Sequence, residues 1–266
     1  MKAIKRKPVV LDVANQIRAA ILDGGLVPGS KIAQDELAAE LGVSRLPVRQ
    51  ALLVLQREGL VFLDHGRGAL VAPLDIKFIS DLFDYRAVVD GYVAAVLAAR
   101  EDFNPSALRQ IIRDGKAAAR RGESRRDLVM EFHTAQYDAV GNQVLVRLMK
   151  PLLDHVQRVV TFVQSSVSAT GAVGQRKPLP GLRSQVETWE EHADIADAIA
   201  RHRVGRARAL ARSHVERVKH VAVAYLVSAA PARRGKTAAT DRRRPREAAI
   251  EAELQLPVTF DSTDIR

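Results

Sequence analysis

Cysteine is absent from the 266 residues of this chain. Its absence excludes disulfides, thiolate metal sites and cysteine nucleophiles, so any metal must be held by histidine and carboxylate side chains. Aromatic residues are also few, with seven Phe, four Tyr and one Trp, whereas Ala, Leu, Val and Arg abound. This composition favours aliphatic cores carried by helices, so we expect a mainly α fold.

Long apolar runs are missing as well. The basic N-terminal segment is not followed by an apolar stretch long enough for a signal or membrane helix, and we expect a cytoplasmic protein. Positive charge is in excess, because 41 Lys and Arg against 31 Asp and Glu give a formal net charge of +10. A basic chain favours a polyanionic partner, of which nucleic acid is the commonest, although part of this charge belongs to a C-terminal tail.

Short helical patterns separated by glycine turns fill the first sixty residues. Apolar residues at helical spacing predict helices over residues 8–23, 34–41 and 45–58. Gly42 ends the second of these helices, and Ser44 is placed to cap the third. Two short helices joined by so tight a turn form a helix-turn-helix.

A hairpin is predicted directly after these helices. The β-prone runs 60–63 and 69–71 flank a glycine-containing turn, which is typical of two antiparallel strands. A hairpin in this position is the wing of a winged helix-turn-helix. Helical patterns resume beyond Pro73, so we place this first domain at residues 1–73.

The start of the third helix carries the candidate DNA-reading side chains. Arg45 and Arg49 are four residues apart and share one face where a recognition helix enters the major groove. Arginine can donate two hydrogen bonds to one guanine. Outside a helix-turn-helix, however, a pair of arginines usually lies on a solvent-exposed helix face. The predicted DNA-binding residues are Ser44, Arg45, Leu46, Arg49 and Gln50, with His65, Gly66 and Arg67 of the wing.

The second half of the chain is helical throughout its predicted domain, residues 74–228. Six helical patterns without strands predict a bundle, with Gly141 and Gly205 at helix C-termini and Pro151 as a kink or a helix start. Residues 229–266 are rich in Ala, Pro and Arg and are expected to form a disordered basic tail. The six patterns cover residues 75–100, 105–121, 124–140, 143–168, 182–203 and 206–227.

Several segments of the first domain follow the pattern of a known family. The runs 25–32, Glu36-Leu37-Ala38 and 41–52 resemble the GntR family of regulators, and the resemblance spans residues 9–72. It implies DNA binding as a homodimer on a palindromic operator, with repression as the commoner mode. Where this family often has a basic residue before Glu-Leu-Ala, this chain has Asp35, so one DNA contact is missing.

The helical half, over residues 78–227, resembles the FadR-type, or FCD, ligand-binding domain. The resemblance rests on Asp84-Tyr85-Arg86, Glu131-Phe132-His133, the Gly141-Asn142 turn, the run 191–195 and His214. It implies a small-molecule effector and a divalent metal, either Zn, Ni, Mn or Fe, held by three histidines and a carboxylate. The histidines carry over to His133, His192 and His214, whereas Val129 stands where the carboxylate is expected.

This departure leaves two interpretations of the histidines open. They hold a metal between bundle helices, or they hydrogen-bond the effector directly in a metal-free pocket. Arg86 is a further candidate effector ligand because a guanidinium pairs bidentately with a carboxylate, and its alternative is an ion pair with Asp90 at i+4. A small organic acid is therefore the expected effector. His155, His202 and His220 are interpreted as surface or packing residues.

These observations together predict a transcription regulator whose operator affinity depends on a metabolite bound in the helical domain. A metal-dependent enzyme built on the three histidines is one alternative, but Glu131, two residues before His133, points to another side of its helix and is a poor general base. A DNA-binding dimer without an effector is the other alternative. We expect no catalytic activity.

Overall fold

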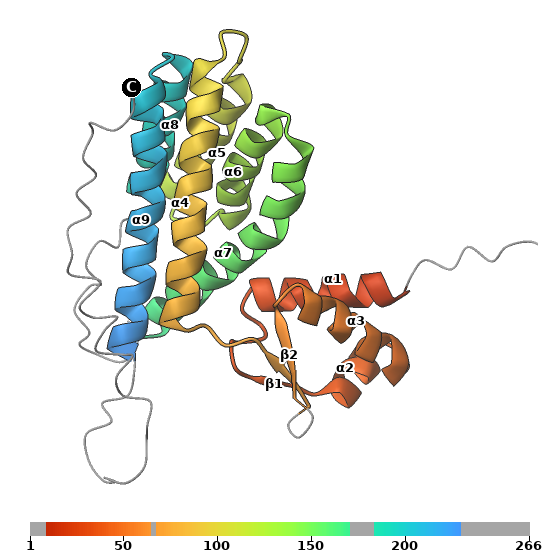
Figure 1. Cartoon of the computed structure of the whole chain (residues 1–266). Helices are drawn as coiled ribbons and strands as arrows, with labels where there is room; N and C mark the ends of the chain where they lie inside the picture. Colours follow the sequence, from red (N-terminus) through yellow and green to blue (C-terminus); the bar gives the residue numbers. More distant parts are fainter. Residues whose placement is uncertain (1–8, 65–67, 171–183, 230–266) are drawn as a thin grey trace, which may run out of the picture. The chain divides into compact units, whose positions relative to one another are not determined.

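The computed structural model describes residues 9–64, 68–170 and 184–229 of the chain (Figure 1). The predicted wing residues His65, Gly66 and Arg67 and almost all of the predicted tail lie outside the described residues. Within the described part, no helix has both the length and the apolar character needed to cross a membrane.

The first domain, here called the head, contains three helices and a small sheet (Figure 1). All strands of the sheet are antiparallel, in the order β1-β3-β2. The hairpin of β2 and β3 is the predicted wing, whereas β1 was not predicted, because two residues are too short to carry an alternating pattern. In chain order the elements are α1 (Val9–Leu22), β1 (Lys31–Ile32), α2 (Gln34–Glu40), α3 (Arg45–Arg57), β2 (Val61–Asp64) and β3 (Gly68–Val71).

An aliphatic core holds the head together, as the composition predicted. Ile17 and Ile21 of α1 and Leu52 and Leu55 of α3 are all at most 1% exposed. Gly42 adopts a positive φ of 63°, which lets the chain turn sharply from α2 into α3. The α3 helix thereby buries one face and presents its first turn outward.

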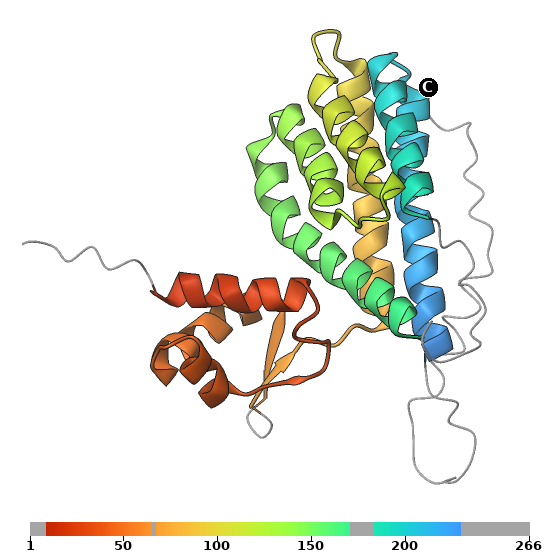
Figure 2. The same ribbon diagram turned by 180° about the vertical axis from the view of Figure 1, so that it is seen from behind.

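The second domain, here called the bundle, is an array of helices (Figures 1 and 2). The most extensive helix packing in the described bundle is between α4 and α9, which lie side by side in both views. The mainly α fold and the predicted bundle are confirmed. The helices are α4 (Ile76–Ala99), α5 (Ser106–Arg120), α6 (Arg126–Val140), α7 (Gln143–Thr170), α8 (Gln185–Ala200) and α9 (Val204–Ala229).

Pro151 lies inside α7, as predicted for the fourth helical pattern, so of the two alternatives given for it the helix start is excluded. One local prediction about the bundle was wrong. Gly205 is the second residue of α9 rather than a C-cap, and the turn before α9 instead uses His202, which has a positive φ of 55°. Gly141 does end α6 in the left-handed conformation, as predicted.

The bundle has two separate apolar cores, and buried polar residues, here called the polar layer, lie between them along α4 and α9. One core includes Phe132 and Trp189, and the other includes Phe83 and Val159. On α4 the buried Asp90 falls between the residues of the two cores, and on α9 the buried His214 does so. Polar groups removed from water must find partners, so this layer is where a site is expected.

Candidate functional site

The predicted DNA-reading residues of α3 lie on the surface of the head. Ser44, Arg45, Leu46, Arg49 and Gln50 are all exposed. Ser44 occupies the N-cap position, as predicted, but its side chain does not cap the helix. The hydroxyl is therefore not committed to the helix, and a helix N-terminus favours a phosphate.

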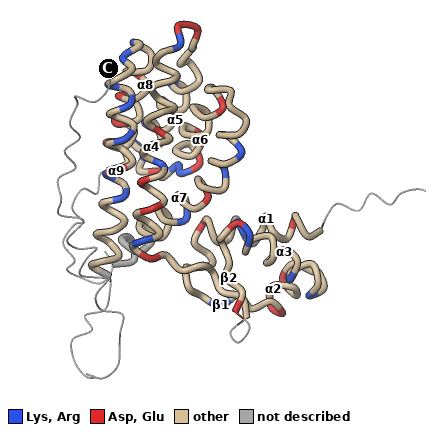
Figure 3. The backbone as a smooth tube through the Cα atoms, viewed as in Figure 1, with Lys and Arg blue, Asp and Glu red and all other residues tan. Residues whose placement is uncertain are grey.

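Arg45 is paired in this structure with a residue that the sequence pattern had marked as unusual. Its Nε lies 2.7 Å from Oδ1 of Asp35, at the start of α2. Both side chains are mostly exposed, so this ion pair contributes at most about 1 kcal/mol. The surface groove that contains Asp35 and Arg45 is also lined by Lys31 and Arg49. Figure 3 shows both basic and acidic residues along the helices of the head. Asp35 thus restrains a candidate reader instead of contacting phosphate itself.

The three predicted histidines come together in the polar layer of the bundle. His133 of α6, His192 of α8 and His214 of α9 each offer a ring nitrogen, and these nitrogens lie within 4.8 Å of one another. All three side chains are buried. Two nitrogens bound to one zinc ion can be no more than about 4.2 Å apart, since Zn–N distances are about 2.0–2.1 Å. A tetrahedral zinc site holds its nitrogens about 3.4 Å apart, so the rings whose nitrogens are farthest apart must move closer to bind an ion.

A carboxylate orients one of these rings by a hydrogen bond, and a second carboxylate lies near another ring. His214 Nδ1 donates to Glu191 Oε2 at 2.7 Å, and Arg217 Nε donates to the other oxygen at 2.7 Å. Asp90 Oδ2 lies 3.6 Å from His133 Nδ1. A carboxylate on one ring nitrogen leaves the opposite nitrogen for a metal, as second-shell carboxylates do in metal sites.

His192 is the least satisfied of the three imidazoles. It is 0% exposed, and neither of its ring nitrogens has a hydrogen-bond partner in the described part of the chain. Its ring packs against Phe132 and Trp189, with centroids 4.5 Å and 5.1 Å away. An imidazole without partners in an apolar environment is costly, and a metal ion would satisfy one nitrogen.

The surroundings of the three histidines favour their neutral form. Burial lowers the pKa of His133, His192 and His214, and the positive charge of Arg86 lowers each pKa further. At His214 the hydrogen bond with Glu191 opposes part of this shift. Burial would raise the pKa of Glu191, but hydrogen bonds from His214 and Arg217 lower it to about 2. Neutral imidazoles are the form that binds metals.

Arg86 lies in the same polar layer, where it pairs with Asp90 and keeps one donor without a partner among the described residues. Its Nε donates to Asp90 Oδ2 at 3.1 Å, and Tyr137 donates its hydroxyl to the other oxygen of Asp90. Burial and the charge of Asp90 raise the pKa of Tyr137, so this hydroxyl stays protonated. Arg86 is 2% exposed, yet its Nη2 has no partner among the described residues. The ion pair therefore leaves one charged donor unused.

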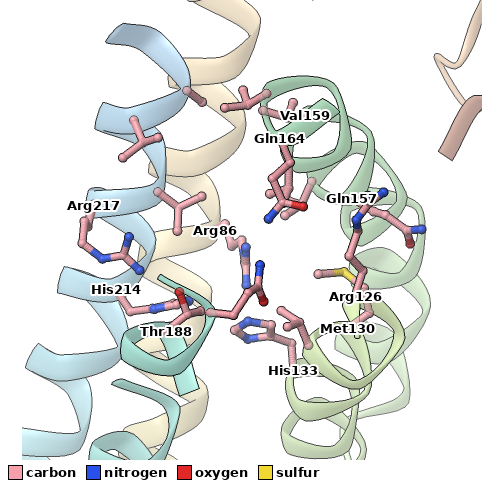
Figure 4. A pocket seen from close by; sticks show the side chains of 18 residues that line it. Arg86, Arg126, Met130, His133, Gln157, Val159, Gln164, Thr188, His214 and Arg217 are labelled. Carbon is pink, nitrogen blue, oxygen red and sulfur yellow. The ribbon is translucent and has the colours of Figure 1, made fainter. Parts of the chain in front are cut away.

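A cavity of about 110 Å³ opens beside this layer (Figure 4). Arg86, His133 and His214 line it, whereas His192 does not and lies deeper in the bundle. Glu131 is exposed and is not part of the wall. The remaining lining residues are Arg126, Val129, Met130, Val156, Gln157, Val159, Val160, Val163, Gln164, Gln185, Thr188, Arg217, Val218, Val221 and Ala222.

Sequence reasoning missed several members of this site. Asp90 was considered only as a partner of Arg86, although it is also the carboxylate nearest to His133, while Val129 lines the cavity. Arg217 was overlooked, but its position three residues after His214 places both on one face of α9. His155 packs edge-on against Phe78, and His202 Nδ1 lies 3.2 Å from the Ala98 carbonyl oxygen.

The head and the bundle each match a described protein family. Residues 10–71 match the bacterial regulatory proteins of the gntR family, and residues 81–217 match the FCD domain. Two solved structures share the fold. One is E. coli McbR/YncC, with a TM-score of 0.64, 16% identity and coverage of 86% of this chain and 100% of that one. The other is a putative GntR transcriptional regulator from Rhodococcus sp. RHA1, with a TM-score of 0.61, 21% identity and coverage of 79% and 95%.

Relatives in sequence extend over both domains. An uncharacterized HTH-type transcriptional regulator in an unstable DNA locus of Streptomyces ambofaciens is 30% identical over 210 residues, covering 78% of this chain and 82% of that protein. The Glc operon transcriptional activator of Escherichia coli strain K12 is 28% identical over 242 residues, covering 81% and 89%. The chain therefore belongs to the gntR family of bacterial regulatory proteins, as a transcription regulator that joins a GntR DNA-binding domain to an FCD effector-binding domain.

Proposed function

We propose that this regulator binds a palindromic operator as a homodimer, and that a small carboxylate in the bundle cavity changes its operator affinity. We expect repression to be its mode of action. The observation that carries the proposal is the buried Nη2 of Arg86, a charged donor without a partner among the described residues, in a side chain that lines the cavity. A guanidinium fork matches a carboxylate in shape and charge.

The charge of the cavity wall also favours an anion. Its described lining contains three arginines and two histidines but no aspartate or glutamate. Asp90 and Glu191 pair with Arg86 and Arg217 but do not line the cavity, so an anion in the cavity meets the cationic groups and not the carboxylates. A ligand with differential affinity for two arrangements of the bundle is what regulation of DNA binding requires.

We further propose that His133, His192 and His214 hold a divalent metal. The unpartnered ring of His192 and the carboxylates behind His133 and His214 support this assignment. The missing carboxylate at Val129 is offset in part by Asp90, although Asp90 is shared with Arg86. When bound, the metal supplies a positive charge that attracts a carboxylate.

The test of the regulatory proposal begins with selection of the operator itself. DNA fragments selected from a random library by the wild-type protein should share a palindrome, and a gel-shift titration with a panel of organic acids should change the fraction bound. A reporter behind the selected operator gives the sign of regulation. Selection of a palindrome whose binding responds to no carboxylate would reduce the protein to a DNA-binding dimer without an effector.

A stripe of exposed apolar side chains on α4 supports the homodimer. Tyr85, Val88 and Tyr92 are 50%, 62% and 51% exposed, and their spacing of three and four residues places them on one face. The same stripe on a second copy can pack against it around a two-fold axis. Burying it removes apolar surface from water, which stabilises association by about 25 cal/mol per Å² before the costs of ordering.

Placing a charge in this stripe is predicted to produce monomers. Val88→Glu puts a carboxylate at the centre of the interface, where it has no partner and its desolvation opposes association. We expect light scattering after size exclusion to report a dimer for the wild type and a monomer for the variant, with operator affinity at least about tenfold weaker. Val144→Glu, at a similarly exposed valine of α7, is the matched control and should stay dimeric.

Reversing the charge of Asp35 is predicted to strengthen DNA binding. Asp35→Lys releases Arg45 and places a cation where the carboxylate repels phosphate, so affinity should rise about tenfold in low salt. The log–log dependence of affinity on salt should become steeper by about 0.9 for each additional phosphate that the protein neutralises. Glu40→Lys makes the same charge change at the exposed end of α2, outside the groove, and should have a smaller effect. Equal effects of the two substitutions would contradict a local role for Asp35.

A further inference from the structure

The cavity has two ends of different chemistry (Figure 4). Arg86, His133 and His214 lie together at one end, with Thr188 and Arg217 beside them. Val159 lies toward the opposite end. The apolar part of the wall consists mainly of valines from α7 and α9, namely Val156, Val159, Val160, Val163, Val218 and Val221, with Ala222.

The arginines of the cavity wall differ in how far their donors are already used. Arg217 is already engaged by Glu191, to which it donates from Nε and Nη2. Arg126 donates from Nη1 to Thr161 Oγ1 at 3.1 Å. Arg86 Nη2 is the arginine donor of this wall that is buried without a partner in the described part of the chain. Arg126 has a neutral partner and keeps its charge, so a second carboxylate is opposed where it would lie against the valines instead of reaching Arg126.

Valine side chains cover most of the end opposite Arg86, where Gln164 is the labelled polar neighbour of Val159. Val156 and Val159 are 0% exposed, Val163 is 4% exposed, and Ala222 is 2% exposed. Hydroxyls of a sugar acid placed against these side chains would lose their bonds to water without replacement. Aliphatic carbons would instead gain about 25 cal/mol per Å² removed from water. The volume of about 110 Å³ lies below the roughly 300–1,000 Å³ usual for drug-sized ligands, so the tail is short.

We infer that the effector is an amphipathic monocarboxylate, with its carboxylate at Arg86 and a short aliphatic tail against the valines of α7 and α9. The inference rests on the proposed function and narrows it to one class of organic acid. Straight-chain alkanoates are its simplest members, and their affinity reports the two ends of the cavity separately.

The test is a calorimetric titration of the full-length protein with acetate, butanoate, hexanoate and octanoate. Affinity should rise about fourfold for each methylene added until the tail fills the cavity, and should then fall. Hexan-1-ol, which has the same tail without the charge, should bind at least about tenfold more weakly than hexanoate. Succinate and citrate should bind more weakly than butanoate.

Filling the apolar end should move the preferred chain length. Ala222→Leu occupies tail space and should lower hexanoate affinity at least about tenfold while leaving acetate unchanged. Ala224→Leu makes the same change two residues away on α9, outside the lining, and should not alter the preference. Val160 is a half-buried lining residue, and Val160→Thr adds a hydroxyl there with little change in shape. This variant should weaken binding of hexanoate more than binding of acetate, and it tests the apolar end if Ala222→Leu fails to fold.

The outcomes separate this inference from the proposed function. Tighter binding of succinate or citrate than of any alkanoate would overturn the amphipathic ligand but leave a carboxylate effector standing. Affinity that is flat with chain length would also overturn it. Binding of hexan-1-ol as tight as that of hexanoate would remove the role of Arg86, and with it the carboxylate effector itself.

Discussion

Gly115→Val is expected to destabilise the bundle by about 3–5 kcal/mol, more than the roughly 1–3 kcal/mol typical of overpacking a core, because the clash is so close. A Cβ atom at Gly115 of α5 would lie 2.1 Å from the Trp189 ring of α8, closer than any real contact. Trp189 is 1% exposed and has little free space into which to move. The backbone at Gly115 is ordinary helix, so valine would be tolerated there if the tryptophan were absent.

Thermal and urea unfolding followed by circular dichroism measures this effect. A loss of this size should lower the melting temperature by about 6–20 °C, since about 1 kcal/mol corresponds to roughly 2–4 °C in a domain of this size. Gly205→Ala is the control, because a Cβ there meets nothing within 4 Å and alanine favours the helix. Combining Gly115→Val with Trp189→Leu should recover part of the loss. A melting temperature of Gly115→Val close to that of the wild type would show that α5 and α8 are not packed as described.

Removing the proposed metal is expected to have the second large effect. Protein purified without chelator should contain nearly one equivalent of a divalent transition metal by elemental analysis, and His133→Ala should contain almost none. Chelation should lower the melting temperature, because a ligand present at about 1,000 times its Kd contributes about 4 kcal/mol of stability. The cause is that buried imidazoles, His192 above all, lose the partner that offsets their desolvation.

His220→Ala is the matched control for the metal measurement. His220 lies on α9, as His214 does, but it is exposed and outside the cluster, so this variant should keep its metal. Absence of metal from the wild type, together with unchanged melting after chelation, would establish a metal-free pocket in which the arginines of the wall, Arg86 first, carry the charge recognised by an anion. The alkanoate series would then remain informative, because it depends on Arg86 and the valines.

Local patterns in the sequence determined much of this protein. Helical periodicity and glycine turns predicted α1 to α3, the hairpin and the six bundle helices. The reason is that apolar residues three and four positions apart define the buried face of a helix. Arg45 and Arg49 were placed on one surface for the same reason. The three histidines were assigned by family resemblance, and the structure brings them together.

Tertiary structure alone decided which side chains meet across helices. Tyr137 and Asp90 are 47 positions apart, and the ion pair of Asp35 with Arg45 joins two different helices. Periodicity gives the face that a helix buries, but not its rotation or axial register against a particular neighbour. The approach of Asp90 to His133, the pairing of Gly115 with Trp189 and the valine wall opposite Arg86 all depend on that register. The composition of the cavity, and with it the class of ligand, could therefore be derived only from the folded chain.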